Sequence, residues 1–147
     1  MAVHVLLDHG ADINALNETA SPYVAETPLQ AAVHSKNPEM VELLLSKGAR
    51  VDGRHRGSMT PLMRAVRDRN MKIIRLLLQA GASVVATDRN GNTPLHIATL
   101  GSREPDMAVI KVLLASGSDP NSRNRHGFAP RQTIMPGSRA LIPAGTP

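Results

Sequence analysis

The chain has 147 residues, a formal net charge of +5 at pH 7 and an aromatic content of only 1%. Its core must be built from Leu, Val, Ile, Met and Ala, which favours packed helices over a β-sandwich or barrel. The sequence contains no cysteine, so disulfides and cysteine-based zinc sites or nucleophiles are excluded. No apolar run reaches the roughly 18–20 residues of a membrane span, and no signal peptide is recognised. We therefore expect no membrane insertion and a cytoplasmic or nuclear location.

The first predicted element is a partial repeat at residues 1–17. Residues 2–14, AVHVLLDHGADIN, align with residues 40–52, MVELLLSKGARVD. The match begins in the middle of the repeated unit, because no helix precedes it that would correspond to the one before Met40. We expect the chain to be a monomer or part of a longer protein.

A Thr-Pro pair opens each of three complete units, and the pairs are spaced by 33 residues. They are Thr27-Pro28, Thr60-Pro61 and Thr93-Pro94. A threonine hydroxyl can cap the N–H groups of a first helical turn, and proline fits the first helical position, where no N–H is needed. The pattern predicts helices near residues 27–35, 60–68 and 93–100. A fixed period of this length is typical of repeat arrays.

A second helix is predicted in each unit, near residues 37–47, 70–80 and 106–116. Leucine-rich stretches supply its apolar face, and a glycine follows it, suited to the left-handed position after a helix end. These glycines are Gly48, Gly81 and Gly117. Extended segments with turn residues then lead back to the next helix start, so we expect a short β-hairpin at each connection.

The order helix, helix, glycine and hairpin is carried most clearly by the stretches NGNTPLHIA and VLLASGSDPN. In these features residues 1 to about 130 resemble the ankyrin repeat. The resemblance implies an all-α solenoid of stacked helix–turn–helix units with short β-hairpin loops, and a structural hydrogen-bonding role for His96. Gln30 and Met63 replace this histidine in the other repeats, which predicts an incomplete network.

The resemblance divides the chain into five repeats, complete or partial, and a tail. The first repeat is partial (1–17), the second has a long hairpin loop (18–52), the third is regular (53–85), the fourth has a short insertion (86–122), the fifth is a degenerate start (123–130), and residues 131–147 form a disordered tail.

Catalytic and cofactor-binding patterns are not found in the sequence. The six histidines are scattered through different repeats, the carboxylates form no recognisable acid–base pair, and the glycines match no phosphate-binding motif. We therefore expect no enzyme activity, no metal and no cofactor.

Arginine placement is the feature that points to a binding surface. Eight basic residues but only two acidic residues lie between residues 50 and 75. Arg64 and Arg67 are predicted on the exposed face of a first helix, and the resemblance implies that this face and the hairpins form a concave binding surface. The predicted partner-binding residues there are Arg64, Arg67, Asp68, His34, Ser35 and Leu100. The hairpins and the long loop add Arg56, Arg89, Arg125 and Tyr23.

Three functions compete. The first is a non-enzymatic scaffold that binds an acidic or mixed-charge segment of a protein partner. The second is binding of nucleic acid or another polyanion through the basic stripe, which the near absence of aromatic residues for base stacking disfavours. The third is the substrate-recruiting part of a ubiquitin-ligase adaptor, although the required C-terminal box is not visible. An arginine-rich surface that is merely solvated is the alternative to all three.

Asn14 and Asn121 each end a hairpin entry, with a leucine eight residues earlier. The resemblance implies that an asparagine at this position can be hydroxylated by an asparaginyl hydroxylase. The alternative is that asparagine is simply a favourable turn residue.

Overall fold

The computed structural model describes residues 9–16, 25–54, 58–100 and 105–130. Residues 1–8 of the predicted first repeat, Tyr23, Arg56 and the predicted tail at 131–147 lie outside the described residues. The helices of the described residues form three pairs: α2 (Pro28–His34) with α3 (Pro38–Ser46), α4 (Pro61–Arg67) with α5 (Met71–Gln79), and α6 (Pro94–Thr99) with α7 (Met107–Ala115). Each predicted helix is confirmed, with bounds that differ by a single residue at either end.

Short polar side chains begin every helix. The Thr27 and Thr60 hydroxyls each accept the N–H of the residue three positions later at 3.2 Å, and Thr93 does so at 3.5 Å. Asn37 and Asn70 cap α3 and α5 in the same way, at 3.0 and 3.2 Å. The Asp106 carboxylate caps α7 by accepting two backbone N–H groups. These bonds satisfy N–H groups that have no partner inside the helix.

Left-handed residues end the helices and turn the chain. Gly48, Gly81 and Gly117 follow the second helices with φ of 90°, 87° and 94°, as predicted from the glycine stops. The turns between α2 and α3 and between α4 and α5 use residues other than glycine: Lys36 has φ 53° and Arg69 has φ 54°. A side chain at such a φ is strained, because its Cβ crowds the backbone.

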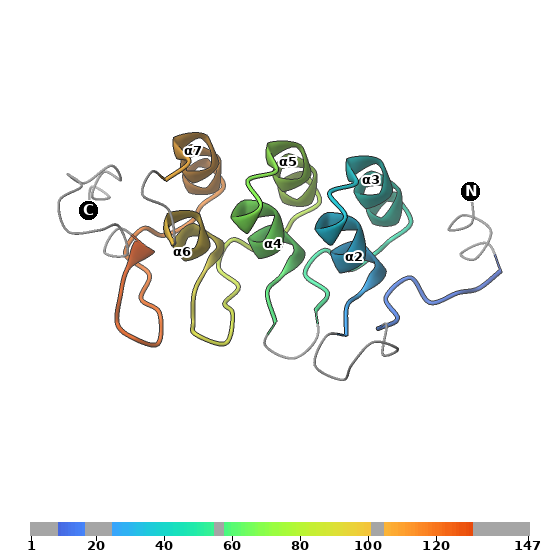
Figure 1. The fold of residues 1–147 in the computed structure, drawn as a ribbon, viewed down its shortest axis with the longest axis horizontal. Helices are drawn as coiled ribbons and strands as arrows, with labels where there is room; N and C mark the ends of the chain where they lie inside the picture. The colour runs from blue at the N-terminus through green and yellow to red at the C-terminus, as the bar shows by residue number, and fades with distance from the viewer. Residues whose placement is uncertain (1–8, 17–24, 55–57, 101–104, 131–147) are drawn as a thin grey trace.

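The helices stack in two layers (Figure 1). The first helices α2, α4 and α6 form one layer and pack on one another, while α3, α5 and α7 form the other. The core lies between the layers and contains fully buried aliphatic side chains such as Leu29, Leu44, Leu62, Ile73, Leu77, Leu95 and Leu113. In the second layer α5 makes less contact with α7 than with α3. No helix among the described residues is long and apolar enough to cross a bilayer.

The connections between repeats project to one side as loops (Figure 1). In the fourth repeat the Asp88 N–H donates to the Asn92 carbonyl at 3.0 Å, and in the fifth the Asn124 N–H donates to the Phe128 carbonyl at 3.0 Å. Apart from an isolated bridge at Glu26, the described residues form no β-strand. The expected hairpins therefore have the turn of a hairpin without a ladder of paired strands in the described part of the chain.

A buried hydrogen-bond network links successive repeats. His96 is fully buried, and its Nε2 lies 2.9 Å from the Phe128 carbonyl of the fifth repeat. Gln30 does the same in the second repeat, because its Nε2 donates to the Met59 carbonyl at 3.1 Å. The expectation that Gln30 leaves the network incomplete is therefore wrong. The Gln30 amide binds the carbonyl at the same repeat position as the His96 imidazole does. Of the three residues at this position, only Met63 has no polar side-chain group.

Candidate functional site

The candidate site is a row of side chains at the C-terminal ends of the first helices. His34, Arg67 and Leu100 occupy the same position in successive repeats, seven residues after the capping threonine. The side chains of His34 and Arg67 are 58% and 50% exposed, and Leu100 is 40% exposed. Because α4 packs between α2 and α6, Arg67 is at the centre of this row.

Asp68 organises the two arginines of α4. Its carboxylate lies 3.5 Å from the Arg64 Nε and 3.9 Å from the Arg67 Nε. Residues four apart share a helix face, so Arg64 folds over Asp68. The prediction that Arg64 is exposed is therefore wrong: only 26% of its side chain is accessible. Arg67 remains half exposed, and its Nη1 donates a hydrogen bond to the Met59 Sδ at 3.6 Å.

The neighbouring predicted residues have local partners of their own. The Ser35 hydroxyl donates to the Ala31 carbonyl at 2.9 Å, and the His34 Nδ1 lies 3.5 Å from the Glu26 carboxylate. Among the described residues no hydrogen bond or ion pair joins either side chain to α4. They extend the row along the array and do not form one cluster with Arg67.

Two of the three predicted hairpin arginines can be placed. Arg89 and Arg125 are exposed, and Arg56 lies outside the described residues. The Arg125 N–H donates to the Asn90 carbonyl at 2.9 Å, so the loops of the fourth and fifth repeats lie against each other. Gly91 permits this approach, because a Cβ there would lie 2.8 Å from the Arg125 nitrogen. Its φ of 77° also suits glycine.

Other basic residues of the stripe have structural partners. Arg54 donates to the Ser58 carbonyl at 3.0 Å and to the Thr87 carbonyl of the next repeat at 2.7 Å. Lys72 of α5 donates to the Glu39 carboxylate of α3 at 3.1 Å. No motif in the sequence indicated these contacts. Arg54 and Thr87 are 33 residues apart, and so are Glu39 and Lys72. This spacing, which places the partners in adjacent repeats, is the only feature of the sequence that indicates these contacts.

Glu39 is the acidic partner in the second of these pairs. A hydrogen bond from its own backbone N–H at the start of α3 lowers the pKa of its carboxyl, and the hydrogen bond from Lys72 lowers it further. Both groups favour the charged carboxylate. The pair is exposed on the second layer, away from the row on the first helices.

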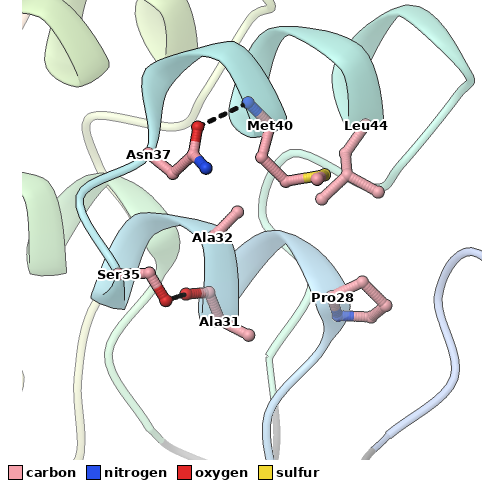
Figure 2. A pocket seen from close by; sticks show the side chains of 7 residues that line it. All are labelled: Pro28, Ala31, Ala32, Ser35, Asn37, Met40 and Leu44. Carbon is pink, nitrogen blue, oxygen red and sulfur yellow. Dashed lines mark hydrogen bonds between the residues drawn. The ribbon is translucent and has the colours of Figure 1, made fainter. Parts of the chain in front are cut away.

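Within the described residues, clefts border the first helices at two places. Figure 2 shows the one on the N-terminal side of the array, between α2 and α3, lined by Pro28, Ala31, Ala32, Ser35, Asn37, Met40 and Leu44. The Asn37 Oδ1 and the Ser35 hydroxyl are paired with backbone groups there. The counterparts of Met40 in the next two repeats, Ile73 and Val109, are buried. This cleft is thus the stacking surface of the second repeat.

The second cleft lies between the third and fourth repeats, beside Arg67. It is lined by Val66, Arg67, Arg69, Ile97, Ala98, Leu100, Asp106 and Val109. The structure therefore brings Arg67 and Leu100 together, as predicted, and adds Arg69 and Asp106 to them.

Asn14 and Asn121 both participate in turns. The Asn14 Oδ1 accepts the Arg50 N–H at 2.8 Å, across the boundary between the first and second repeats. The Asn121 N–H donates to the Asp119 carboxylate at 2.8 Å. These bonds give both residues a role in the turns, and their hydroxylation stays a prediction.

The described residues contain no group of three or more His, Asp or Glu side chains that could hold a metal ion. A family model described as ankyrin repeats (3 copies) matches residues 1–88 and 53–124. A comparison with curated proteins gives no match.

Proposed function

The chain belongs to the ankyrin-repeat family, whose repeats are generally protein–protein interaction modules, and we propose that it is a non-enzymatic module that binds an acidic segment of a partner protein. The proposed surface is the row on the first helices, with Arg67 at its centre. The exposed arginines of the hairpins, Arg89 and Arg125, lie outside the row and attract the same partner at longer range.

The exposure and pairing of Arg67 carry this proposal. Its side chain is half exposed, and its contacts with Asp68 and Met59 are 3.9 and 3.6 Å long. The ion pair with Asp68 is long, and a thioether sulfur is a weak acceptor. The guanidinium is therefore held weakly, and its donors can turn to a carboxylate from outside. Arginine suits this role because its planar fork binds a carboxylate through two parallel hydrogen bonds.

Arg64 has a supporting role in this proposal. Its ion pair with Asp68 reduces the negative charge that Asp68 would otherwise present to Arg67 and to an acidic partner. The net charge of +5 acts in the same direction, because a positive surface speeds the encounter with an acidic segment.

The test uses peptides selected from a random library displayed on phage, with the purified chain as bait. We expect the selected peptides to be enriched in Asp and Glu. Arg67→Ala should weaken their binding by about tenfold or more, which is about 1.4 kcal/mol. The matched control is Arg75→Ala, which removes an exposed arginine from α5 in the other layer and should change binding by less than about twofold.

Three outcomes would count against the proposal. The first is that no peptide is selected, and the second is that the selected peptides carry no excess of acidic residues. The third is that Arg67→Ala and Arg75→Ala weaken binding equally. A single-stranded oligonucleotide of about 20 residues serves as a second probe. Tight binding of that strand, with a steep loss as salt is raised, would favour the polyanion alternative.

A further inference from the structure

The boundary between the third and fourth repeats differs from the other boundaries in its side-chain bonds. In the second repeat, Gln30 and Asp52 both reach across to the third: Gln30 donates to the Met59 carbonyl, and the Asp52 carboxylate accepts the Ser83 N–H at 3.1 Å. The equivalent residues of the third repeat are Met63 and Val85. Both polar connections are therefore replaced by apolar side chains in the same repeat.

Packing of the second layer is also looser at this boundary, whereas α6 packs on α4 as closely as α4 packs on α2. In the second layer α5 makes less contact with α7 than with α3. Ala98 on α6 is partly exposed, whereas its counterparts Ala32 and Ala65 are 5% and 1% exposed. The cleft described above lies at this boundary, and Ala98 is part of its wall.

We infer that the cleft between the third and fourth repeats receives one carboxylate side chain of the partner segment, with an apolar neighbour of that residue resting on Leu100. This inference rests on the proposed function and specifies how the partner is recognised. The occupant is an aspartate or glutamate in an extended peptide, followed or preceded by a small aliphatic residue.

The size and lining of the cleft select this occupant. Its volume is about 40 Å³, which has room for a few water-sized groups and therefore for a carboxylate but not for an aromatic ring. Arg67 and Arg69 line it as positive groups. Asp106 is the acidic residue of the lining, and its Oδ1 is engaged by the Ala108 and Val109 N–H groups.

The remaining wall of the cleft is apolar. Val66, Ile97 and Val109 are buried at its floor, and Leu100 is exposed at its edge. A carboxylate placed between this floor and Arg67 is partly removed from water, which strengthens its hydrogen bonds to the guanidinium. An aliphatic neighbour that covers Leu100 would add burial of apolar surface.

The experiment uses the selected acidic peptides and a variant that fills the cleft. Ala98→Leu adds three carbon atoms to the cleft wall, and we expect it to weaken binding by about tenfold or more. The matched control is Ala108→Leu, the same change at an exposed position of α7 outside the cleft, which should leave affinity unchanged. Circular dichroism and thermal unfolding establish that both variants fold. If Ala98→Leu does not fold, Leu100→Ala replaces it, with an expected loss of about threefold or more.

A double-mutant cycle then tests the charge contact. Arg67→Ala in the chain and Glu→Gln (or Asp→Asn) in the peptide should not be additive, because both remove the same contact. If Arg67→Ala weakens binding while Ala98→Leu and Leu100→Ala do not, the cleft is not the site and the proposed function stands. If the cleft variants weaken binding but the cycle is additive, the carboxylate assignment is overturned. If no variant changes binding, both the inference and the proposed function fail.

Discussion

His96 shows how one buried side chain connects two repeats. Its Nε2 lies 2.9 Å from the Phe128 carbonyl, which can only accept, so the ring proton is assigned to Nε2. The Nδ1 atom then accepts the Thr93 N–H at 3.2 Å and lies 2.8 Å from the Thr93 hydroxyl. One neutral imidazole therefore closes the start of its own helix and holds the next repeat.

We predict that His96→Gln is tolerated and His96→Leu is not. Gln30 makes the equivalent pair of bonds, accepting the Thr27 N–H at 3.1 Å and donating to the Met59 carbonyl. His96→Gln should therefore change the free energy of unfolding by less than about 1 kcal/mol. His96→Leu should lower it by about 1–3 kcal/mol, because the buried Thr93 N–H loses its acceptor. Urea unfolding followed by circular dichroism measures both, and equal losses would contradict the assigned bonds.

Lys36 is the position where a single change should stabilise the fold. Its φ of 53° is left-handed, and a Cβ in this conformation costs roughly 1–2 kcal/mol. Glycine has no Cβ, so its only cost is the larger loss of backbone entropy on folding. Lys36→Gly should therefore raise the free energy of unfolding by about 0.5–1 kcal/mol. Lys36→Ala, which removes the charge but keeps the Cβ, is the control and should have little effect. Equal stability of the two variants would show that the turn is not strained.

At the scale of the elements, the helices could be predicted closely because their ends are encoded locally. Threonine and asparagine caps, first-turn prolines and glycine stops each act within one turn of the chain. The 33-residue period then placed Arg67 and Leu100 in the same row. Both features depend on short-range chemistry and on a spacing that the sequence displays directly.

The hydrogen-bond and ion-pair partners of the long side chains could not be predicted in this way. Arg64 was expected on an exposed basic surface, yet it folds onto Asp68. Arg54, one of the eight basic residues between 50 and 75, reaches the Thr87 carbonyl. Several acceptors are within the reach of an arginine, and the choice among them depends on packing between repeats. The cleft beside Ala98 depends on the same packing, so no sequence pattern indicated it.

We predict that groups on two helices, the Glu39 N–H on α3 and Lys72 on α5, together lower the pKa of Glu39. Because its pKa is lowered in the folded chain, the carboxylate stabilises the fold above its unfolded pKa, and this contribution is lost as the pH falls through the folded pKa. Lys72→Met should raise the pKa of Glu39 only part of the way, since the hydrogen bond from its own N–H is the larger cause. Carboxyl NMR titration measures this, with Lys111→Met on α7 as the control. A complete return to the unfolded value would contradict the order of the two causes.

Across the whole molecule, each boundary between repeats combines apolar stacking with a few polar connections. Asn14 accepts the Arg50 N–H at the first boundary, and Asp52 accepts the Ser83 N–H at the second. At the third boundary the same position is Val85, which is 67% exposed and offers no acceptor to the Asp119 N–H. The Arg54 bond to the Thr87 carbonyl still crosses this boundary. In an array of this kind, stability is roughly a sum of repeat and boundary contributions, so a further polar connection at Val85 should stabilise this boundary.

We predict that Val85→Asn strengthens this boundary. The asparagine can accept the Asp119 N–H as Asn14 accepts that of Arg50, and an exposed valine is removed without loss of buried apolar surface. The free energy of unfolding should rise by about 0.5–1.5 kcal/mol, seen as a higher midpoint in urea with an unchanged or steeper slope. The reverse change, Asp52→Val, should lower stability by a similar amount or more. Amide hydrogen exchange locates the effect: protection should increase in α6 and α7 for Val85→Asn and decrease in α4 and α5 for Asp52→Val. If protection rose evenly over all helices, or did not rise at all, the polar connections would not control how the repeats separate.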